Sequence, residues 1–341
     1  MPVEHLPGSS IITRSFESGD EAQILELFAR SFHTTRSLEE WRWRYERDPS
    51  GNRHISVSFD AAGHLMAHYA GYPVAFWNRG ETGWMANQIG DTMTATDARH
   101  LGRGPSSVLG RTAEHFYATF CRGKVAFNYG FNTANIQRFS VRFLDSTRVE
   151  DVPHRMLDMS RTPLSPQSRL VRRARGFTLE LIADIDQSEW DEFFVRVAGD
   201  YGLLVRRDAE YIRWRYLIPV WMKYIVVAVR KRGLLVGWSV FRIVGDRLVW
   251  GDALFDSRHP RSVEVVLRHV APLFHRDGVH HLEGWFPDRP GWFSAHLESI
   301  GFVRVPEPHG LALMCVPFEK PGAADEMAKS LYYTKGDSDL F

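Results

Sequence analysis

The stretch "GDTMTATDARHLGRGPSSVLGRTAEHF", residues 90–116, decides how this sequence is interpreted. A strand is predicted where it begins and a helix from about Pro105, since proline suits the first helical turn, where its missing N–H costs nothing. The loop between them contains Arg99, Gly102 and Gly104. Glycines let the backbone approach a ligand closely, and the open N–H groups at a helix N-terminus attract phosphate. The stretch therefore predicts a site for an anionic ligand.

A second signal is the sequence "RWRY", which occurs at Arg42–Tyr45 and again at Arg213–Tyr216. The copies stand about half the chain apart, whereas solenoid repeats recur every ~20–50 residues. Each copy is followed by two predicted strands joined by a turn at Gly63 or Gly233, where glycine supplies the positive φ of a tight turn. Each half then reads as strand, helix, strand, helix and strand. The repeat predicts a duplicated domain of mixed α/β structure.

The chain length agrees with a duplication, because 341 residues exceed the ~100–200 of a typical single domain. We predict an N-terminal domain at residues 1–160 and a C-terminal domain at residues 177–318. Between them, residues 161–176 are rich in proline, serine and arginine, which predicts a linker. Residues 319–341 are polar and predict a partly ordered tail.

Composition restricts the class of protein. Lys and Arg (42) nearly balance Asp and Glu (41), which argues against a nucleic-acid binder working through overall positive charge. No apolar run approaches the ~20 residues that span a bilayer, so no membrane association is expected. The two cysteines show no metal-binding spacing, so no metal is expected and a reducing, cytoplasmic location is predicted.

The loop carries a resemblance to a known family. Arg99-x-x-Gly102-x-Gly104 matches the R/Q-x-x-G-x-G/A motif of the GNAT superfamily, the acetyl-CoA-dependent N-acetyltransferases, in which this loop binds the CoA pyrophosphate. Further on, "YGFNTANIQRFSVRFLD", residues 129–145, resembles the second CoA element of the family, a strand, an Asn and a helix. The whole chain resembles tandem GNAT proteins. The resemblance implies two GNAT-like acyl-CoA N-acyltransferase domains, each an α/β fold with a mixed sheet.

The resemblance also implies which residues contact the cofactor, acetyl-CoA or another acyl-CoA. The pyrophosphate loop would comprise Arg99, Leu101, Gly102, Arg103, Gly104 and Ser106. The backbone of Met93 and Thr94 would pair with pantetheine in the manner of an added strand. Asn135 would contact the pantetheine arm and Phe139 would flank the CoA. A helix N-cap is the alternative role for Asn135.

The second half departs from the family at the corresponding segment, "DALFDSRHPRSVEVVL", residues 252–267. Arg258 and Arg261 are present, but no glycine lies between Gly251 and Gly278. Without glycines the backbone cannot close around a pyrophosphate, so the second domain is predicted to be degenerate.

The "RWRY" repeat is predicted to be structural. Its Trp side chains would pack on the sheet, and its Arg side chains would face outward or pair with acids. The alternative is that Trp41, Trp43 and Trp214 line an acceptor cleft.

Catalytic groups are harder to assign. In many members of the family a Glu acts as base and a Tyr protonates the thiolate, but here those positions correspond roughly to Gln88 and Val141. Asp91, the carboxylate on the strand before the loop, is a candidate base, directly or through water. Its alternative role is structural. Tyr129, on the neighbouring strand, is the candidate acid, with a core role as the alternative.

The leading hypothesis is an acyl-CoA-dependent N-acyltransferase that moves acetyl from acetyl-CoA to a primary amine of a small molecule by direct attack. A non-catalytic acyl-CoA sensor or scaffold module is the alternative, favoured by the missing Glu and Tyr. A third hypothesis is an aminoacyl- or peptidoglycan-type transferase, since such enzymes also pair two GNAT-like halves. The intact loop Arg99–Gly104 argues against the third. The expected partners are the small-molecule amine and, as a possibility, a second copy of the chain.

Overall fold

The computed structural model of the protein describes residues 11–160, 176–275 and 278–341. The chain forms two compact units, and each is considered by itself. Unit 1 comprises Met1–Val74, Met85–Arg148 and Met314–Ala324. Unit 2 comprises Ala75–Trp84, Val149–Leu313 and Asp325–Phe341.

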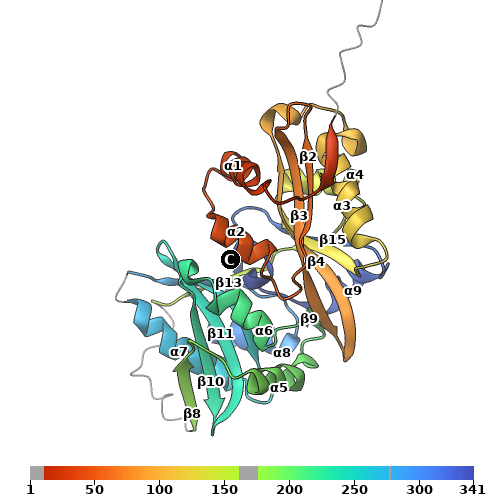
Figure 1. Ribbon diagram of the computed structural model, residues 1–341. Coiled ribbons are helices and arrows are strands. Elements are labelled where there is room, and N and C mark those ends of the chain that lie inside the picture. The colour runs from red at the N-terminus through yellow and green to blue at the C-terminus, as the bar shows by residue number, and fades with distance from the viewer. Residues whose placement is uncertain (1–10, 161–175, 276–277) are drawn as a thin grey trace, which may run out of the picture. The chain divides into compact units, whose positions relative to one another are not determined.

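Unit 1 is built on a sheet whose strands follow the order β1-β2-β3-β4-β5-β15. Helices α1 and α2 lie on one face of this sheet and α3 and α4 on the other (Figure 1). The elements are β1 (Ile12–Ser15), α1 (Glu21–Phe32), α2 (Leu38–Tyr45), β2 (His54–Phe59), β3 (Leu65–Asn78), β4 (Glu81–Thr94), α3 (Val108–Phe116), β5 (Phe127–Asn132), α4 (Ala134–Phe143) and β15 (Ala312–Pro317). Short 3-10 turns occupy Thr96–Ala98 and Gly104–Ser106, and a π turn, Tyr117–Cys121, continues α3.

Strands β4 and β5 diverge, and this divergence positions the site. Their parallel pairing covers Ala86–Gln88 and Phe127–Tyr129, while β4 continues to Thr94 and β5 to Asn132. Within β4, Asp91 has a φ of 50°, a left-handed conformation that interrupts the regular strand. The last part of β4, which leads to the predicted cofactor loop, therefore lies beyond this pairing with β5.

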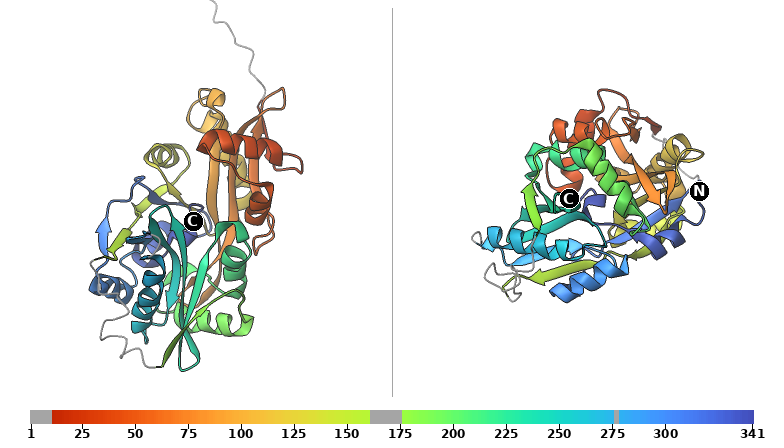
Figure 2. Two further views of the ribbon diagram at one scale, coloured as in Figure 1. Left: turned by 90° about the vertical axis from the view of Figure 1, so that its left-hand side faces the viewer. Right: turned by 90° about the horizontal axis from the view of Figure 1, so that it is seen from below.

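Unit 2 is built on a second mixed sheet, in the order β14-β7-β13-β12-β11-β10-β8. Helix α7 lies on one face of β10 to β12, and α5 and α6 lie on the other (Figures 1 and 2). The elements are β6 (Thr147–Asp151), β7 (His154–Asp158), β8 (Phe177–Leu181), α5 (Gln187–Ala198), β9 (Leu203–Val205), α6 (Ala209–Ile212), β10 (Ile225–Lys231), β11 (Leu234–Val244), β12 (Arg247–Phe255), α7 (Arg261–His275), β13 (His281–Trp285), α8 (Gly291–Ile300), β14 (Val303–Val305), α9 (Ala323–Ser330) and β16 (Leu331–Tyr332). A π turn at Arg213–Leu217 contains the second "RWRY".

The predicted fold class is confirmed, since both units combine helices with a mixed sheet. The turns at Gly63 and Gly233 also occur, with φ values of 84° and 88°. The first cofactor helix begins at Val108 instead of Pro105, because the 3-10 turn intervenes and Ser107 is the N-cap.

The compact units do not follow the predicted domain boundaries. Strand β7 lies before residue 160 in the sequence but pairs with β13 and β14 in unit 2. Conversely, β15 follows the second half of the sequence but adds a strand next to β5 in the sheet of unit 1. Residues 161–175 of the predicted linker lie outside the described residues.

The expectation of a partly ordered tail is wrong. Residues 319–341 contain α9 and β16, and several side chains after residue 330 are buried: Leu331, Tyr332, Tyr333, Thr334, Asp337, Ser338 and Phe341. The overall polarity of the segment concealed this, because the aromatic residues that anchor it are few and separated by polar ones. Among the residues that the structure describes, no helix is long and apolar enough to cross a membrane.

Candidate functional site

An outer groove of about 440 Å³ opens in unit 1 beside the glycine loop. The end of β4, the loop, the start of α3 and the start of α4 each contribute to its walls. The lining residues are Thr92, Thr94, Ala98, Arg99, Ser107, Val108, Leu109, Thr133, Asn135, Ile136 and Phe139. The groove thus brings together the two sequence segments that predicted a CoA site.

The glycines of the loop are required by the fold of the loop itself. Gly102 and Gly104 have φ values of 78° and 54°, which side chains rarely adopt. A Cβ at Gly102 would lie 2.4 Å from the carbonyl oxygen of Ser106, and one at Gly104 would lie 2.7 Å from the ring of Phe143. Ser107 Oγ then caps α3 by accepting a hydrogen bond from the Gly110 N–H at 3.1 Å. The loop is therefore a tight backbone turn that leads directly into a helix N-terminus.

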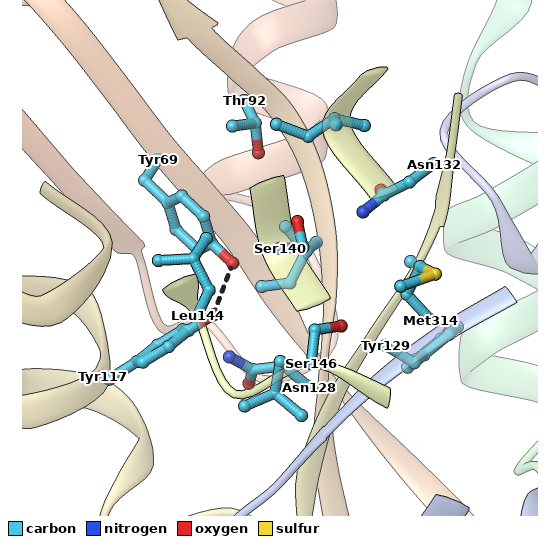
Figure 3. Close-up of a pocket in the computed structure, with 14 residues that line it drawn as sticks. Tyr69, Thr92, Tyr117, Asn128, Tyr129, Asn132, Ser140, Leu144, Ser146 and Met314 are labelled. Atoms are coloured by element: carbon cyan, nitrogen blue, oxygen red, sulfur yellow. Dashed lines mark hydrogen bonds between the residues drawn. The ribbon is translucent and has the colours of Figure 1, made fainter. Parts of the chain in front are cut away.

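A smaller inner pocket of about 30 Å³ adjoins the groove, because Thr92 and Ile136 line both cavities. Figure 3 shows its lining, which comes from β3, β4, β5, β15, the π turn after α3, and α4 with the residues that follow it. The polar side chains of this lining are all hydroxyls and amides; they belong to Tyr69, Thr92, Tyr117, Asn128, Tyr129, Asn132, Ser140 and Ser146. A water needs roughly 10–15 Å³ of such space, so the pocket has room for about two small groups.

The wall of the inner pocket includes a pair of tyrosines. The hydroxyl oxygens of Tyr69 and Tyr117 are 3.1 Å apart and hydrogen-bonded (Figure 3). Burial raises the pKa of both phenols, so both are neutral hydrogen-bonding groups at ordinary pH. Tyr117 begins the π turn, a local irregularity that often occurs at functional sites.

The predicted cofactor residues divide into two groups. Four line the outer groove: Thr94, Arg99, Asn135 and Phe139. The others do not: Met93 lies in the hydrophobic core, Leu101 packs against that core, Gly102 and Gly104 shape the loop, and Arg103 and Ser106 are exposed on it. Thr92, Ser107 and Thr133 were missed, although Thr92 stands two positions before Thr94 and shares its side of the strand.

Asn135 does not cap its helix, so the N-cap interpretation is wrong. Thr133 occupies the N-cap position of α4. Asn135 instead lines the groove, and its Oδ1 accepts a hydrogen bond from Arg138 at 3.0 Å.

Asp91 is held in a buried ion pair. It accepts hydrogen bonds from the Tyr45 hydroxyl at 2.7 Å and from the guanidinium of Arg36. Burial by itself raises the pKa of Asp91, but the charges of Arg36 and Arg44 outweigh burial and hold that pKa below its usual range. A carboxylate in this state accepts protons poorly, so the arrangement favours the structural role over the role of base.

The same arrangement recurs in unit 2. Asp252 accepts hydrogen bonds from the Tyr216 hydroxyl at 2.6 Å and from Arg207 Nε at 3.0 Å. The aspartate follows a glycine in each half, Gly90 or Gly251, and the tyrosine is the last residue of each "RWRY". The repeat therefore encodes a buried Arg–Tyr–Asp cluster twice.

The interpretation of "RWRY" is correct for its tryptophans, since Trp41, Trp43 and Trp214 are buried and line neither cavity described above. Of the two alternatives for its arginines, facing outward does not apply to the second arginine of each copy. Arg44 and Arg215 are buried, at 5% and 1% exposure; the charge of Arg44 acts on Asp91, whereas Arg215 donates a hydrogen bond to the backbone oxygen of Ser338.

Gln88 and Tyr129 face each other across β4 and β5. Gln88 is fully buried, donates a hydrogen bond from Nε2 to the carbonyl of Ile89 at 2.9 Å, and lines neither cavity. Tyr129 is buried as well, at 3% exposure, but lines the inner pocket. Of the three candidate catalytic residues, Tyr129 is the one that lines either of the two cavities.

The corresponding loop of unit 2 has a different chemistry. Between β12 and α7, Asp256 accepts hydrogen bonds from the Arg258 N–H at 3.0 Å and from Arg258 Nε at 2.8 Å. Asp256 itself is fully buried. The loop of unit 2 thus places a buried carboxylate, paired with Arg258, at the N-terminal side of α7, where unit 1 has the glycine loop.

Comparison with solved structures identifies the fold. Neither the protein-family models nor the curated proteins gave a match to this sequence. A probable N-acyltransferase from Enterococcus faecalis matches with a TM-score of 0.66 and 12% identity, over 92% of this chain and 74% of that one. A GCN5-related N-acetyltransferase from Kribbella flavida matches with a TM-score of 0.63 and 12% identity, over 92% and 73%. The N-myristoyltransferase of Saccharomyces cerevisiae with bound myristoyl-CoA matches with a TM-score of 0.60 and 11% identity, over 93% and 84%. The chain thus has the GCN5-related N-acetyltransferase fold, as the sequence resemblance predicts.

Proposed function

We propose that this protein is an acyl-CoA-dependent N-acyltransferase, which moves acetyl from acetyl-CoA to a primary amine of a small molecule by direct attack. The observation that carries the proposal is the outer groove, which extends from the glycine loop along β4 and continues into the inner pocket. The N-acyltransferase descriptions of the structural neighbours, and the myristoyl-CoA bound to one of them, support it.

In this proposal the groove holds CoA. The pyrophosphate lies at the N-terminus of α3, where N–H groups and the exposed Arg99 provide positive potential. The backbone of β4 from Thr92 to Thr94, beyond its pairing with β5, accepts the amide groups of pantetheine as an added strand would. Thr133 and Asn135 face the same arm from α4.

The inner pocket then receives the acyl group and favours acetyl. Its volume of about 30 Å³ admits a group of a few atoms, but not a long alkyl chain. Its hydroxyl and amide lining adds to this selection, because burying an alkyl chain against polar groups would deprive them of hydrogen-bond partners.

The reaction needs little covalent help from the protein. The neutral amine attacks the thioester carbonyl, a C–N bond forms, the C–S bond breaks, and the leaving thiolate takes a proton. Tyr129 is the candidate donor of that proton, since it lines the inner pocket. The amine loses its proton to solvent in this scheme, because Asp91 is held ionised by Arg36 and lines neither cavity.

A second candidate function is a non-catalytic acyl-CoA sensor. It is favoured by one observation, that the carboxylate expected to act as base is fixed in a buried ion pair. In that case acyl-CoA would bind in the same groove without any transfer.

A thiol-release assay with acetyl-CoA across a panel of small amines separates the two functions. We expect thiol release that depends on particular amines and falls for Arg99→Ala. Arg122→Ala is the matched control, since Arg122 is exposed and pairs with Glu114 outside both cavities. Binding of CoA without thiol release for any amine would favour the sensor, and failure to bind CoA would reject both functions.

A further inference from the structure

The divergence of strands that opens the groove in unit 1 recurs in unit 2. Strands β12 and β13 pair in parallel from Arg247 and His281 to Trp250 and Gly284. Beyond this pairing β12 continues to Phe255, as β4 continues beyond its own pairing with β5. In unit 2, however, the edge of β12 is in contact with residues 331–341 of the chain.

This segment contacts β12 at the glycine–aspartate step. The Tyr332 hydroxyl donates a hydrogen bond to the carbonyl of Ala253 at 2.8 Å, and Thr334 Oγ1 donates one to Asp252 at 2.9 Å. The ring of Phe341 lies against Gly251 so closely that an added Cβ would be 1.8 Å from it. The segment therefore contacts both backbone and side-chain groups of β12 where this strand extends beyond its pairing with β13.

The same segment reaches β13. Lys335 Nζ lies 3.6 Å from Glu283 Oε1 and 5.5 Å from the ring centroid of Trp285. Residues 331–341 thus contact both strands on the two sides of the divergence.

Two buried arginines hold the segment from a third side. Arg215 donates hydrogen bonds to the backbone carbonyls of Gly336, Ser338 and Phe341, the first two at 3.3 and 3.1 Å. Arg207 donates one to the carboxylate of Asp337 at 2.5 Å. Both arginines are almost completely buried, so each would lose part of its hydrogen bonding if the segment left, although Arg207 would keep Asp252 and Arg215 would keep the Tyr224 hydroxyl.

We propose that unit 2 contains a peptide-binding cleft between β12 and β13, and that residues 331–341 are its built-in ligand. The segment lies at the strand divergence that in unit 1 opens into the groove, and three of its backbone oxygens accept hydrogen bonds from the buried guanidinium of Arg215. The occupied cleft is closed to other ligands, and unit 2 depends on the segment for its stability. The proposal rests on unit 2 alone and does not require the transferase activity.

The contact between Phe341 and Gly251 gives a sharp test in the full chain. Gly251→Ala should lower the midpoint of thermal unfolding by several degrees, because the added methyl group overlaps the ring. Combined with Phe341→Ala, which removes the ring, the same substitution should cost much less. Equal losses in both backgrounds would mean that the segment is not held in the cleft, and would overturn the proposal.

A second experiment tests whether the segment behaves as a ligand. The chain ending at Ser330 is unfolded in denaturant and refolded with a synthetic peptide of residues 331–341, "LYYTKGDSDLF". We expect the peptide to restore cooperative thermal unfolding. The matched control is the same peptide with Gly336→Ala, whose methyl group would lie 2.2 Å from the Tyr216 hydroxyl. Equal recovery with both peptides, recovery with neither, or full stability without any peptide would contradict the proposal.

Discussion

The two clefts of this protein have the same strand arrangement and opposite contents. In unit 1 the divergence of β4 and β5 leaves a groove and an inner pocket, and the loop beside it contains Gly102 and Gly104. In unit 2 the divergence of β12 and β13 is in contact with the chain's own residues 331–341, and the loop carries the buried carboxylate of Asp256. The two units therefore share an architecture but differ in what lies at the divergence and in the loop beside it, and we expect only unit 1 to bind CoA.

The buried Arg–Tyr–Asp cluster is common to both halves, and that is informative about its role. Unit 2 keeps the cluster although its cleft is occupied. Because the Arg–Tyr–Asp cluster is also present in the unit for which we propose no transfer chemistry, we assign it a structural role. It connects the irregular turn of the central strand to the helical segment that contains "RWRY". The same explanation then applies to Asp91 in unit 1.

The largest effect is expected from removing the aspartate of either cluster. Asp91→Ala and Asp252→Ala each remove one carboxylate from a buried arginine, and breaking a buried pair in this way typically costs about 3–5 kcal/mol of unfolding free energy. Both variants should therefore unfold at much lower denaturant concentration than the parent chain. A folded Asp91→Ala variant with parental stability and strongly reduced turnover would instead identify Asp91 as the base.

The next largest effect concerns the glycine loop. Gly104→Val introduces a branched side chain at a φ of 54° against the ring of Phe143, so the loop must change its conformation. We expect CoA affinity to fall by at least about 100-fold, measured by titration calorimetry, while the protein stays folded.

Calorimetry also tests the comparison of the two halves directly. The parent chain should bind one CoA, in unit 1, because Asp256 and residues 331–341 oppose binding in unit 2. Two CoA molecules per chain would contradict the prediction that the second domain has lost its CoA site. Unchanged affinity in Gly104→Val would exclude the loop as the pyrophosphate site.

A smaller effect is expected in acyl-chain preference. Leu144 lines the inner pocket and is labelled in Figure 3, so Leu144→Ala should enlarge the space for the acyl group. The ratio of kcat/KM for butyryl-CoA to that for acetyl-CoA should rise by about 10-fold. Leu297→Ala, a buried truncation on α8 of unit 2, is the control for general destabilisation. An unchanged ratio would place the acyl group elsewhere.

The smallest effect is a pH dependence in the occupied cleft. Burial alone raises the pKa of Glu283, but His154 and Arg247 outweigh it and lower that pKa to about 2. Because the folded pKa lies below the ordinary value of 4.5, the ionised Glu283 stabilises the fold above pH 4.5, and this contribution is lost as the pH falls towards 2. The difference in Tm between the parent chain and Glu283→Gln should therefore shrink between these pH values. A difference that stays constant would show that Glu283 is not coupled to folding.

Much of the fold was predictable because its signals are local. Glycines with positive φ occur in the turns at Gly63 and Gly233 and in the loop at Gly102. The tolerance of glycine for positive φ is a property of the residue itself and does not depend on tertiary contacts. Apolar periodicity indicated the helices and strands on both sides of that loop for the same reason. The Arg–Tyr part of the two clusters also has a sequence signal, because Arg36 precedes Tyr45 by the same spacing as Arg207 precedes Tyr216.

The partners of these residues were decided by tertiary structure alone. From the sequence, Asp91 was a candidate base, but in the folded chain it is bonded to Arg36 and Tyr45. The tail was predicted to be partly ordered because it is polar, but its aromatic residues are buried in unit 2. In the same way, the strands β7 and β15 join sheets that their positions in the sequence did not indicate. The sequence by itself determined the local backbone conformations, including the glycine turn at Gly102 and Gly104, because these depend on neighbouring residues. Long-range pairing decided which charges are neutralised and which cleft stays open, because burial and Coulomb energy depend on groups that meet only in the folded chain.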